Sequence, residues 1–536
     1  MSYHRFLIVV WCAVGVLLLS LRPGWAAPPS GEIAIAWHVT IPSTWFDPSA
    51  APAGITPFGV LYAIHDALVR PLPGAKMGAS LAESWRVSSD GLSYEFNLRR
   101  GLKFHNGDPV TTEDVKFSFE RYKGVGASEL QARVRQVEIV NPLTVRFHLK
   151  EPWPDFMTFY GTPTTAAGLV VPKKYVTEVG DEGFRKKPIG AGPYRFVSYQ
   201  PGDTLVLEAN PGYWRRVPFV NRLVMKSIPE GTTRAAMLKR GEADIAYALE
   251  GAEVETVTRD PRLRVGASQY TSVSWLEFAD QWQPRSAWHD RRVRLAANLA
   301  LNRKAIGGAA CPGSCGPAGT IIPRAMDGAL RVPPPSYDPQ KAKQLLQEAG
   351  YPNGFDAGDL AVIGSSSTVA AADAVTKDLN AVGIRVNLRR MERAAFFAAW
   401  REKKLSGLFL AAAGTPGNAA NRIQTYVYSK GGFAYGGYPD TDDLFEQQAR
   451  ERDALKRQAL LSKIQQVTID RAMFAPLLEH PLLVGVGPRV NALSWIHDSP
   501  FPAYEDLIVG VEGVPCSCDK NCGSNCCVKC MTIPIL

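Results

Sequence analysis

Three stretches in the first half of the chain alternate apolar and polar residues on both sides of a turn dipeptide. The dipeptides are Asp90-Gly91, Asn141-Pro142 and Pro201-Gly202, and the first of them lies in "SWRVSSDGLSYEFNLR". Alternation with a period of two residues on each side of such a turn predicts an antiparallel β-hairpin. The first half of the chain is therefore expected to be rich in antiparallel strands.

The sequence pattern changes near residue 291. Helices are expected over 291–306, 339–351, 371–383, 394–404, 442–452 and 454–473, and short strands over 384–391, 407–414, 481–487 and 504–511. Helices that alternate with strands are typical of an α/β domain. Because 536 residues are too many for one hydrophobic core, we expect two or three lobes, one of which is an α/β lobe in the second half.

The N-terminus has the pattern of an export signal. A basic residue precedes an apolar run over 6–21, and small residues stand before Ala27 in the positions that favour cleavage. The run is shorter than the roughly 20 residues that a membrane-spanning helix needs. Cys12 lies in the middle of the run and not at its cleavage end, which argues against a lipoprotein signal. We therefore expect residues 1–26 to be a cleaved signal peptide and the mature protein to be periplasmic.

The charge of the chain is moderate and dispersed. The formal net charge is +9 and its basic residues are spread along the sequence. This balance mildly favours anionic ligands, although salt screens exposed charges over roughly 8–10 Å. Basic residues do not alternate with aromatic ones as they do in many nucleic-acid-binding proteins, so we expect no nucleic acid as a partner.

The stretch "GLKFHNGDPVTTEDVKFSFERY", residues 101–122, concentrates a histidine and many charged residues, but structural roles account for them. Thr111 begins "TTED", a pattern that caps the N-terminus of a helix, and "NGDP" is a turn.

The sequence has no H-E-x-x-H, G-x-S-x-G or P-loop motif, and its eight histidines have no metal-ligand spacing. We expect no catalytic residues and no cofactor. A secreted enzyme with a site between lobes is the alternative, and product formation would distinguish it.

Six motifs, in order along the chain, resemble those of the bacterial extracellular solute-binding proteins of family 5, the peptide-, nickel- and opine-type receptors of ABC importers. The first runs from Leu81 to Tyr122 and contains the stretch just quoted. The other five are "GAGPYRFVSYQPGDTLVLEANPGYW", "RAAMLKRGEADIA", "YDPQKAKQLLQEAGYPNGF", "ERDALKRQALLSKIQQVTIDRAMFAPLLEH" and "YEDL". The resemblance that these motifs mark extends over almost all of residues 32–512.

The resemblance implies an α/β, two-lobed periplasmic binding protein of the class II-like, cluster C type, with an extra antiparallel-strand-rich subdomain in lobe I. Lobe I would comprise residues 27–270 and 482–513, and lobe II residues 271–481. It also implies a monomer that closes by a hinge on a small-molecule or peptide-like solute. The partners of such a receptor are an inner-membrane ABC permease and its ATPase subunits.

The solute is expected to differ from an ordinary free peptide. In peptide-binding members of the family, an Asp in the segment before the last helices pairs with the α-ammonium group of the peptide. Here no acid occurs between Glu402 and Asp440, and Thr415 stands at the position of that Asp. Burying an ammonium without a counter-charge is costly, so we expect a neutral or anionic solute. The alternatives are an acid from elsewhere in the chain, or amine recognition through water.

The residues that we expect to line the cleft come from both lobes. Most are aromatic or polar side chains near the expected crossings or in the acid-free segment, and Arg422 would meet an anionic group. The candidates are Trp45, Thr162, Thr164, Trp275, Trp282, Thr415, Asn418, Asn421, Arg422 and Tyr426.

The cysteines fall into two groups after the signal. Cys311 and Cys315 form "CPGSC", in which we expect a local disulfide because an exported protein meets an oxidising compartment. Residues 514–536 form a cysteine-rich tail beyond the resemblance. Its six cysteines allow up to three disulfides or a thiolate cluster for Zn or Cu(I), and the cluster would make the chain a metal-sequestering protein. They are Cys516, Cys518, Cys522, Cys526, Cys527 and Cys530.

Overall fold

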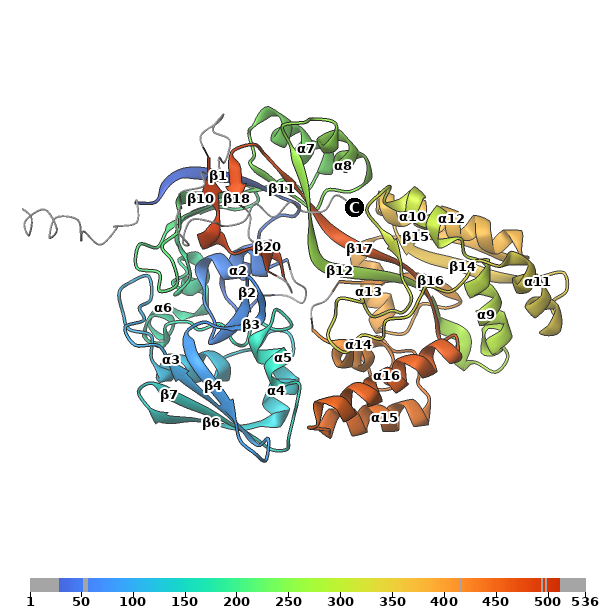
Figure 1. Ribbon diagram of the computed structural model, residues 1–536, viewed down its shortest axis with the longest axis horizontal. Helices are drawn as coiled ribbons and strands as arrows, with labels where there is room; N and C mark the ends of the chain where they lie inside the picture. The colour runs from blue at the N-terminus through green and yellow to red at the C-terminus, as the bar shows by residue number, and fades with distance from the viewer. Residues whose placement is uncertain (1–27, 52–55, 415–416, 493–494, 497–498, 511–536) are drawn as a thin grey trace, which may run out of the picture.

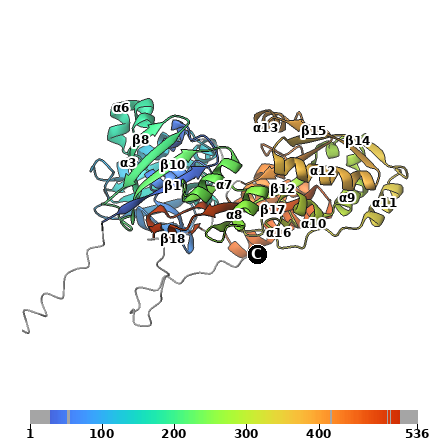
Figure 2. The ribbon, with the colours of Figure 1, turned by 90° about the horizontal axis from the view of Figure 1, so that it is seen from above.

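The computed structural model describes residues 28–51, 56–414, 417–492, 495–496 and 499–510 (Figure 1). The predicted signal peptide, Thr415 and the cysteine-rich tail lie outside this range. Two lobes stand side by side in both views of the ribbon, and the chain crosses between them near the middle (Figures 1 and 2). None of the helices in the described ranges is both long enough and apolar enough to span a bilayer.

One mixed sheet extends through both lobes. Its strand order from lobe II to lobe I is β15 (Ile384–Met391), β14 (Phe355–Ile363), β16 (Leu408–Ala413), β12 (Arg264–Phe278), β17 (Phe474–Val486), β11 (Ile245–Tyr247), β1 (Ser30–Trp37), β10 (Val220–Ser227), β9 (Thr204–Ala209) and β8 (Tyr194–Gln200). The short strand β13 (Gly316–Pro317) also pairs with β17. The central strands β12 and β17 are antiparallel and carry the chain into lobe II and back.

Lobe I carries a separate four-stranded antiparallel sheet, which is the subdomain that the resemblance implied. Its order is β4 (Ala82–Val87), β5 (Ser93–Leu98), β7 (Thr144–Leu149) and β6 (Val134–Asn141). Small two-stranded sheets pair β2 (Val69–Leu72) with β3 (Ala75–Ala79), β18 (Val490–Ala492) with β21 (Ile508–Val509), and β19 (Trp495–Ile496) with β20 (Ser499–Pro502). The helices of this lobe are η1 (Ser43–Phe46), α2 (Phe58–Ile64), α3 (Thr112–Glu120), α4 (Ala127–Arg133), α5 (Phe156–Gly161), α6 (Lys173–Lys186), α7 (Gly231–Arg240), α8 (Gly251–Thr258) and η4 (Tyr504–Asp506).

The three hairpins predicted from the sequence are confirmed. The pairs β4–β5, β6–β7 and β8–β9 are each antiparallel neighbours. The predicted helix start at Thr111 is also confirmed, because the Asp114 carboxylate accepts a hydrogen bond of 2.8 Å from the Thr111 backbone N–H. Local turn and cap chemistry was sufficient to predict these features.

Lobe II covers its part of the sheet with helices. They are η2 (Ala279–Trp282), η3 (Ala287–His289), α9 (Arg291–Ala300), α10 (Arg303–Ala310), α11 (Pro339–Glu348), α12 (Ser366–Ala381), α13 (Arg393–Arg401), α14 (Ala419–Tyr426), α15 (Pro439–Arg450) and α16 (Ala454–Asp470). The helix expected over 291–306 is two helices, because the Asn302 side chain accepts from the Ala305 N–H and starts α10. The strand β14 was not expected from the sequence, and it runs parallel to both β15 and β16.

Each lobe has its own hydrophobic core. The lobe I core runs from Ile33 to Met225 and is completed by residues that follow the second crossing, among them Val484 and Leu507. The lobe II core consists of two clusters between Val273 and Leu478. Residues after β17 therefore return to pack in the first lobe.

Candidate functional site

A buried ion network holds the C-terminal "YEDL" segment against lobe I. Glu505 accepts hydrogen bonds of 2.8 Å from both Arg70 and Arg215. Asp66 lies 3.4 Å from Arg70 and accepts hydrogen bonds from the Tyr213 hydroxyl, the Trp214 indole N–H and the Ser80 hydroxyl. Arg70, Asp66 and Glu505 are all almost fully buried. The strand expected over 504–511 is wrong for its first three residues, which form the turn η4 and direct their acids into this network.

The two lobes touch through a carboxylate at the start of α5. Asp155 in lobe I accepts a 2.6 Å bond from Arg457 on α16 and a 2.7 Å bond from the Asn418 side chain at the start of α14. Asn418 also donates to the Thr158 hydroxyl at 3.2 Å. Asp155 is only 5% exposed. Helices α4 and α5 face α14 to α16 across this contact (Figure 1).

Four of the predicted site residues lie beside this contact. Asn418 and Asn421 form a reciprocal capping box that starts α14. Thr162 ends α5 and donates to the Thr158 carbonyl oxygen, and its hydroxyl lies 2.8 Å from that of Thr164. The structure thus brings together polar candidates that are more than 250 residues apart in the chain. Their contact with a solute stays a prediction.

The aromatic candidates lie in or against the lobe cores. Trp275 is 0% exposed, and its ring centroid lies 5.2 Å from that of Tyr426, in the lobe II core. Trp282 packs against Tyr438 at 5.0 Å between ring centroids. Trp45 in η1 is buried in the lobe I core. Burying the indole of Trp275 stabilises lobe II, and the contact of these aromatic side chains with a solute stays a prediction.

Arg422 is also buried. Its side chain is 2% exposed, one guanidinium nitrogen donates to the Ala413 carbonyl oxygen at 2.8 Å, and the group lies near the Tyr426 ring. The guanidinium is thus engaged at the end of β16, and its contact with an anionic solute stays a prediction. Thr415, the residue at the family Asp position, lies outside the described residues.

Asp155, which was not expected from the sequence, supplies an acid next to the acid-free segment. It comes from lobe I, about 260 residues earlier, so no pattern within 403–439 could reveal it. Its carboxylate is already paired with Arg457 across the lobes. One alternative to a neutral or anionic solute was an acid supplied from elsewhere in the chain. Asp155 is such an acid, but in these contacts Arg457 balances its charge.

A second acid, Glu277, is buried beneath the aromatic cluster of lobe II. Its Oε2 accepts from the Trp275 indole N–H at 2.8 Å. Burial raises the pKa of Glu277 from 4.5 to about 8, against a smaller opposing effect of the indole hydrogen bond. Since the folded pKa lies above the unfolded one, ionisation of Glu277 costs stability. Its contribution is favourable at low pH and is lost as the pH rises from about 4.5 to about 8.

Replacing Glu277 with glutamine is expected to remove this loss. Glutamine keeps an oxygen that accepts from Trp275 but carries no charge, so the variant should gain about 3–5 kcal/mol over the parent protein at pH 9. Urea unfolding at pH 5 and pH 9 measures the difference. If the free energy of unfolding changed equally with pH in the parent protein and the variant, the raised pKa of Glu277 would be contradicted.

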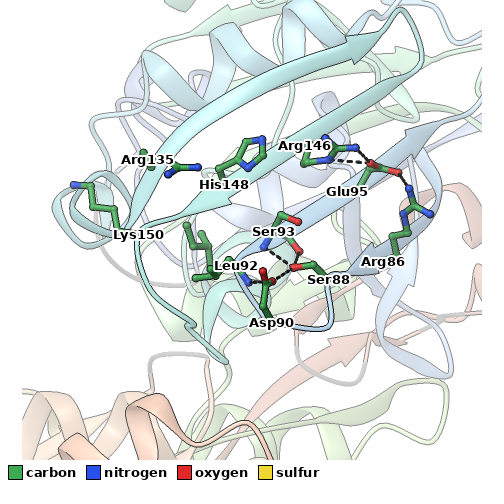
Figure 3. Close-up of a pocket in the computed structure, with 11 residues that line it drawn as sticks. Arg86, Ser88, Asp90, Leu92, Ser93, Glu95, Arg135, Arg146, His148 and Lys150 are labelled. Atoms are coloured by element: carbon green, nitrogen blue, oxygen red, sulfur yellow. Dashed lines mark hydrogen bonds and ion pairs between the residues drawn. The ribbon is translucent and has the colours of Figure 1, made fainter.

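A separate hollow lies over the polar face of the four-stranded sheet (Figure 3). Arg86 and Arg146 both pair with Glu95 there, at 2.6 and 2.5 Å. The turn at Asp90 is fixed by hydrogen bonds with Ser88 and Leu92. Because Glu95 is shared by the two arginines and Glu138 pairs with Arg146 as well, these contacts favour a structural role for this face of the sheet.

Two lobes with separate cores, joined by long paired strands and touching through polar groups, define the fold of a solute-binding protein of the periplasmic type. The sequence of residues 76–434 matches the family model described as bacterial extracellular solute-binding proteins, family 5 Middle. The chain belongs to that family. Among similar proteins is a glutathione-binding protein, GsiB, of Pectobacterium atrosepticum, 31% identical over 318 residues. That match covers 58% of this chain and about 60% of the length of the relative.

Solved structures share the fold. The periplasmic binding protein DppA of Helicobacter pylori, in complex with the peptide STSA, aligns with a TM-score of 0.74 at 24% identity. The alignment covers 90% of this chain and 98% of that one. NikA of Brucella suis, in complex with Fe(III)-EDTA, aligns with a TM-score of 0.80 at 23% identity, over 90% of this chain and 100% of that one. DppA and GsiB are both named as binding proteins.

Proposed function

We propose that this protein is an extracytoplasmic receptor that closes its two lobes on a small solute and delivers the solute to an ABC importer. The observation that carries the proposal is the contact of Asp155 with Asn418 and Arg457, which joins two separately packed lobes. Such contacts exist only when the lobes are together. A solute that binds the closed form better than the open form shifts the population toward it.

The lobe division proposed here is residues 27–270 with 482–513 against 271–481. It is supported by the separate cores and by the pairing of β12 with β17, whose register shifts between Ala267 and Thr271 and again between Ser274 and Trp275. Irregular pairing at these points offers a place for the two strands to bend. The proposal also includes export of the chain through a cleaved signal peptide. The closed receptor then delivers its solute to an inner-membrane permease with its ATPase subunits.

The solute class we propose is a small organic molecule, neutral or anionic, not a peptide held through its α-ammonium group. The acid-free segment 403–439 supports this, and Asp155 is neutralised by Arg457. The similarity to a protein named for glutathione binding agrees with an anionic solute. Glutathione carries two carboxylates and one ammonium group, so it is the first probe to use.

A panel of solutes tests the proposal on the full mature chain. Glutathione, N-acetylated glutathione, opine-type acids, and ordinary tri- and tetrapeptides are compared by thermal shift and small-angle X-ray scattering. A true solute at 100 times its Kd adds about 2.7 kcal/mol of stability and reduces the radius of gyration as the lobes close. Ordinary peptides that bind tightly and lose binding on N-acetylation would contradict the solute class. A bound molecule that is recovered chemically changed would contradict the receptor itself.

A further inference from the structure

The structure places a histidine of the returning strand against the "CPGSC" loop. Cys311 and Cys315, the predicted pair, are joined by a disulfide with their Cα atoms 5.7 Å apart. The Nδ1 atom of His480 on β17 lies 3.2 Å from the Cys315 sulfur and 3.9 Å from the Cys311 sulfur. All three side chains are partly exposed. No spacing in the sequence relates His480 to these cysteines, which precede it by more than 160 residues.

Backbone pairing holds the loop in this position. Helix α10 ends at Cys311, whose N–H donates to the Gly307 carbonyl oxygen. Directly after Cys315, Gly316 pairs with Glu479 in the sheet, next to His480. Both cysteines are thus fixed at the ends of a short loop, and the histidine is fixed on the strand that faces it.

The orientation of the imidazole ring is also fixed. Its Nε2 atom lies 2.8 Å from the hydroxyl of Ser274 on β12, which is buried beside it. When Nε2 carries the proton and donates it to Ser274, Nδ1 presents its lone pair to the two sulfurs. Proteins orient a metal-ligating histidine in this way, through a hydrogen bond made by the ring nitrogen that does not bind the metal.

We propose that, once the disulfide is reduced, Cys311, Cys315 and His480 form a three-ligand site for a thiophilic metal ion such as Zn²⁺. The site is distinct from the cysteine-rich tail and does not depend on the identity of the solute. Three protein ligands leave a fourth tetrahedral position for water or another ligand. Two thiolates and one imidazole form the soft donor set that selects Zn²⁺ or Cu(I).

The distances fit such a centre with little movement of the backbone. Tetrahedral coordination with Zn–S near 2.3 Å and Zn–N near 2.0–2.1 Å places a thiolate about 3.5 Å from the ligating nitrogen and the two sulfurs about 3.8 Å apart. The present Nδ1–sulfur distances of 3.2 and 3.9 Å lie on either side of the first value. The sulfurs must separate after reduction, and side-chain rotation can provide this with the Cα atoms 5.7 Å apart.

The chemistry balances with a dithiol as the reductant. The dithiol donates two electrons to the Cys311–Cys315 bond, becomes a disulfide, and leaves two protein thiols. Zn²⁺ then displaces one proton from each thiol as the two Zn–S bonds form, and Nδ1 binds without losing a proton. A disulfide oxidant reverses the step: it accepts two electrons from the two thiolates and becomes a dithiol, the loop disulfide re-forms, and the metal ion is released.

Zinc titration of the mature chain, residues 27–536, tests the proposal. The six tail cysteines are changed to serine by point substitution, so that only Cys311 and Cys315 remain in the mature protein. Reduced protein, freed of reductant under anaerobic conditions, is titrated with Zn²⁺ against a chromophoric chelator. We expect one equivalent to bind to reduced protein and none to the disulfide form. With Co²⁺ as the probe, a thiolate-to-metal charge-transfer band is expected.

Variants then assign the ligands. Cys311→Ser with Cys315→Ser should abolish binding, His480→Ala should weaken it at least about 100-fold, and Ser274→Ala should weaken it about 10- to 100-fold. His148→Ala is the matched control, because this partly exposed histidine pairs with Glu138 on the four-stranded sheet, and its zinc affinity should equal that of the parent. Metal-free melting temperatures establish that each variant is folded. Equal zinc binding by the oxidised protein, or by a folded His480→Ala variant, would overturn the proposal.

Discussion

Replacing Arg70 with methionine is expected to lower the free energy of unfolding by about 3–5 kcal/mol, the usual cost of removing one partner from a buried ion pair. Methionine retains most of the volume but leaves Asp66 and Glu505 as buried carboxylates with a missing cation. Glu505 keeps its bond to Arg215, whereas Asp66 keeps only neutral donors. Urea unfolding near neutral pH measures the loss.

Arg240→Met is the matched control for this prediction. Arg240 pairs with Glu242 at 2.6 Å, but both side chains are about half exposed. Exposed ion pairs contribute about 0–1 kcal/mol, so this variant should be nearly as stable as the parent protein. If Arg70→Met were as mild as Arg240→Met, the network would not hold the "YEDL" segment against lobe I.

Replacing Asp155 with alanine is expected to weaken solute binding about 10- to 100-fold. The carboxylate accepts bonds from Arg457 and Asn418 across the lobes, and hydrogen bonds to charged groups contribute about 1.5–3 kcal/mol. Because these bonds form only in the closed arrangement, their loss disfavours closure and lowers the apparent affinity without removing a solute contact. Calorimetry with the solute found by the panel measures the change.

Two further variants distinguish a specific effect on lobe closure from a nonspecific loss of solute affinity. Lys76→Ala removes another contact between the lobes, a 2.6 Å pair with Asp327, but both partners are considerably more exposed, so affinity should fall about threefold at most. A double-mutant cycle of Asp155→Ala with Arg457→Ala should show a coupling energy above about 1 kcal/mol in binding. Additive effects in that cycle, or unchanged affinity in Asp155→Ala, would contradict the role of this pair in closure.

Local chemistry explains why much of the fold was predictable. The alternating stretches around Asp90-Gly91 specify both the turn and the inward face of each strand, so the hairpin β4–β5 follows from neighbouring residues alone. The start of α3 follows in the same way from Thr111 and Asp114. In contrast, the break between α9 and α10 depends on one asparagine cap within an otherwise helical pattern, and that signal is weak without the structure.

The candidate site was less predictable, because its residues are defined by contacts between distant segments. Asn418 and Asn421 were recognised from their place in the acid-free segment, but their partner Asp155 comes from the other lobe. Trp275 and Arg422 were expected at the cleft because they lie close in sequence to the expected crossings and to that segment. The structure buries both side chains in lobe II, and no local pattern predicts this because burial depends on what packs over a residue.

The sequence by itself determined the family, the hairpins, the helix starts and the pairing of Cys311 with Cys315, because each depends on residues that are adjacent or recur in a fixed order. Only the tertiary structure decided that β12 and β17 pair along their length, that Asp155 meets Arg457, and that His480 faces the cysteine loop. Those contacts join segments up to about 300 residues apart. They depend on how one sheet runs through both lobes and on how the two lobes meet. No local pattern of side chains encodes such a long-range arrangement.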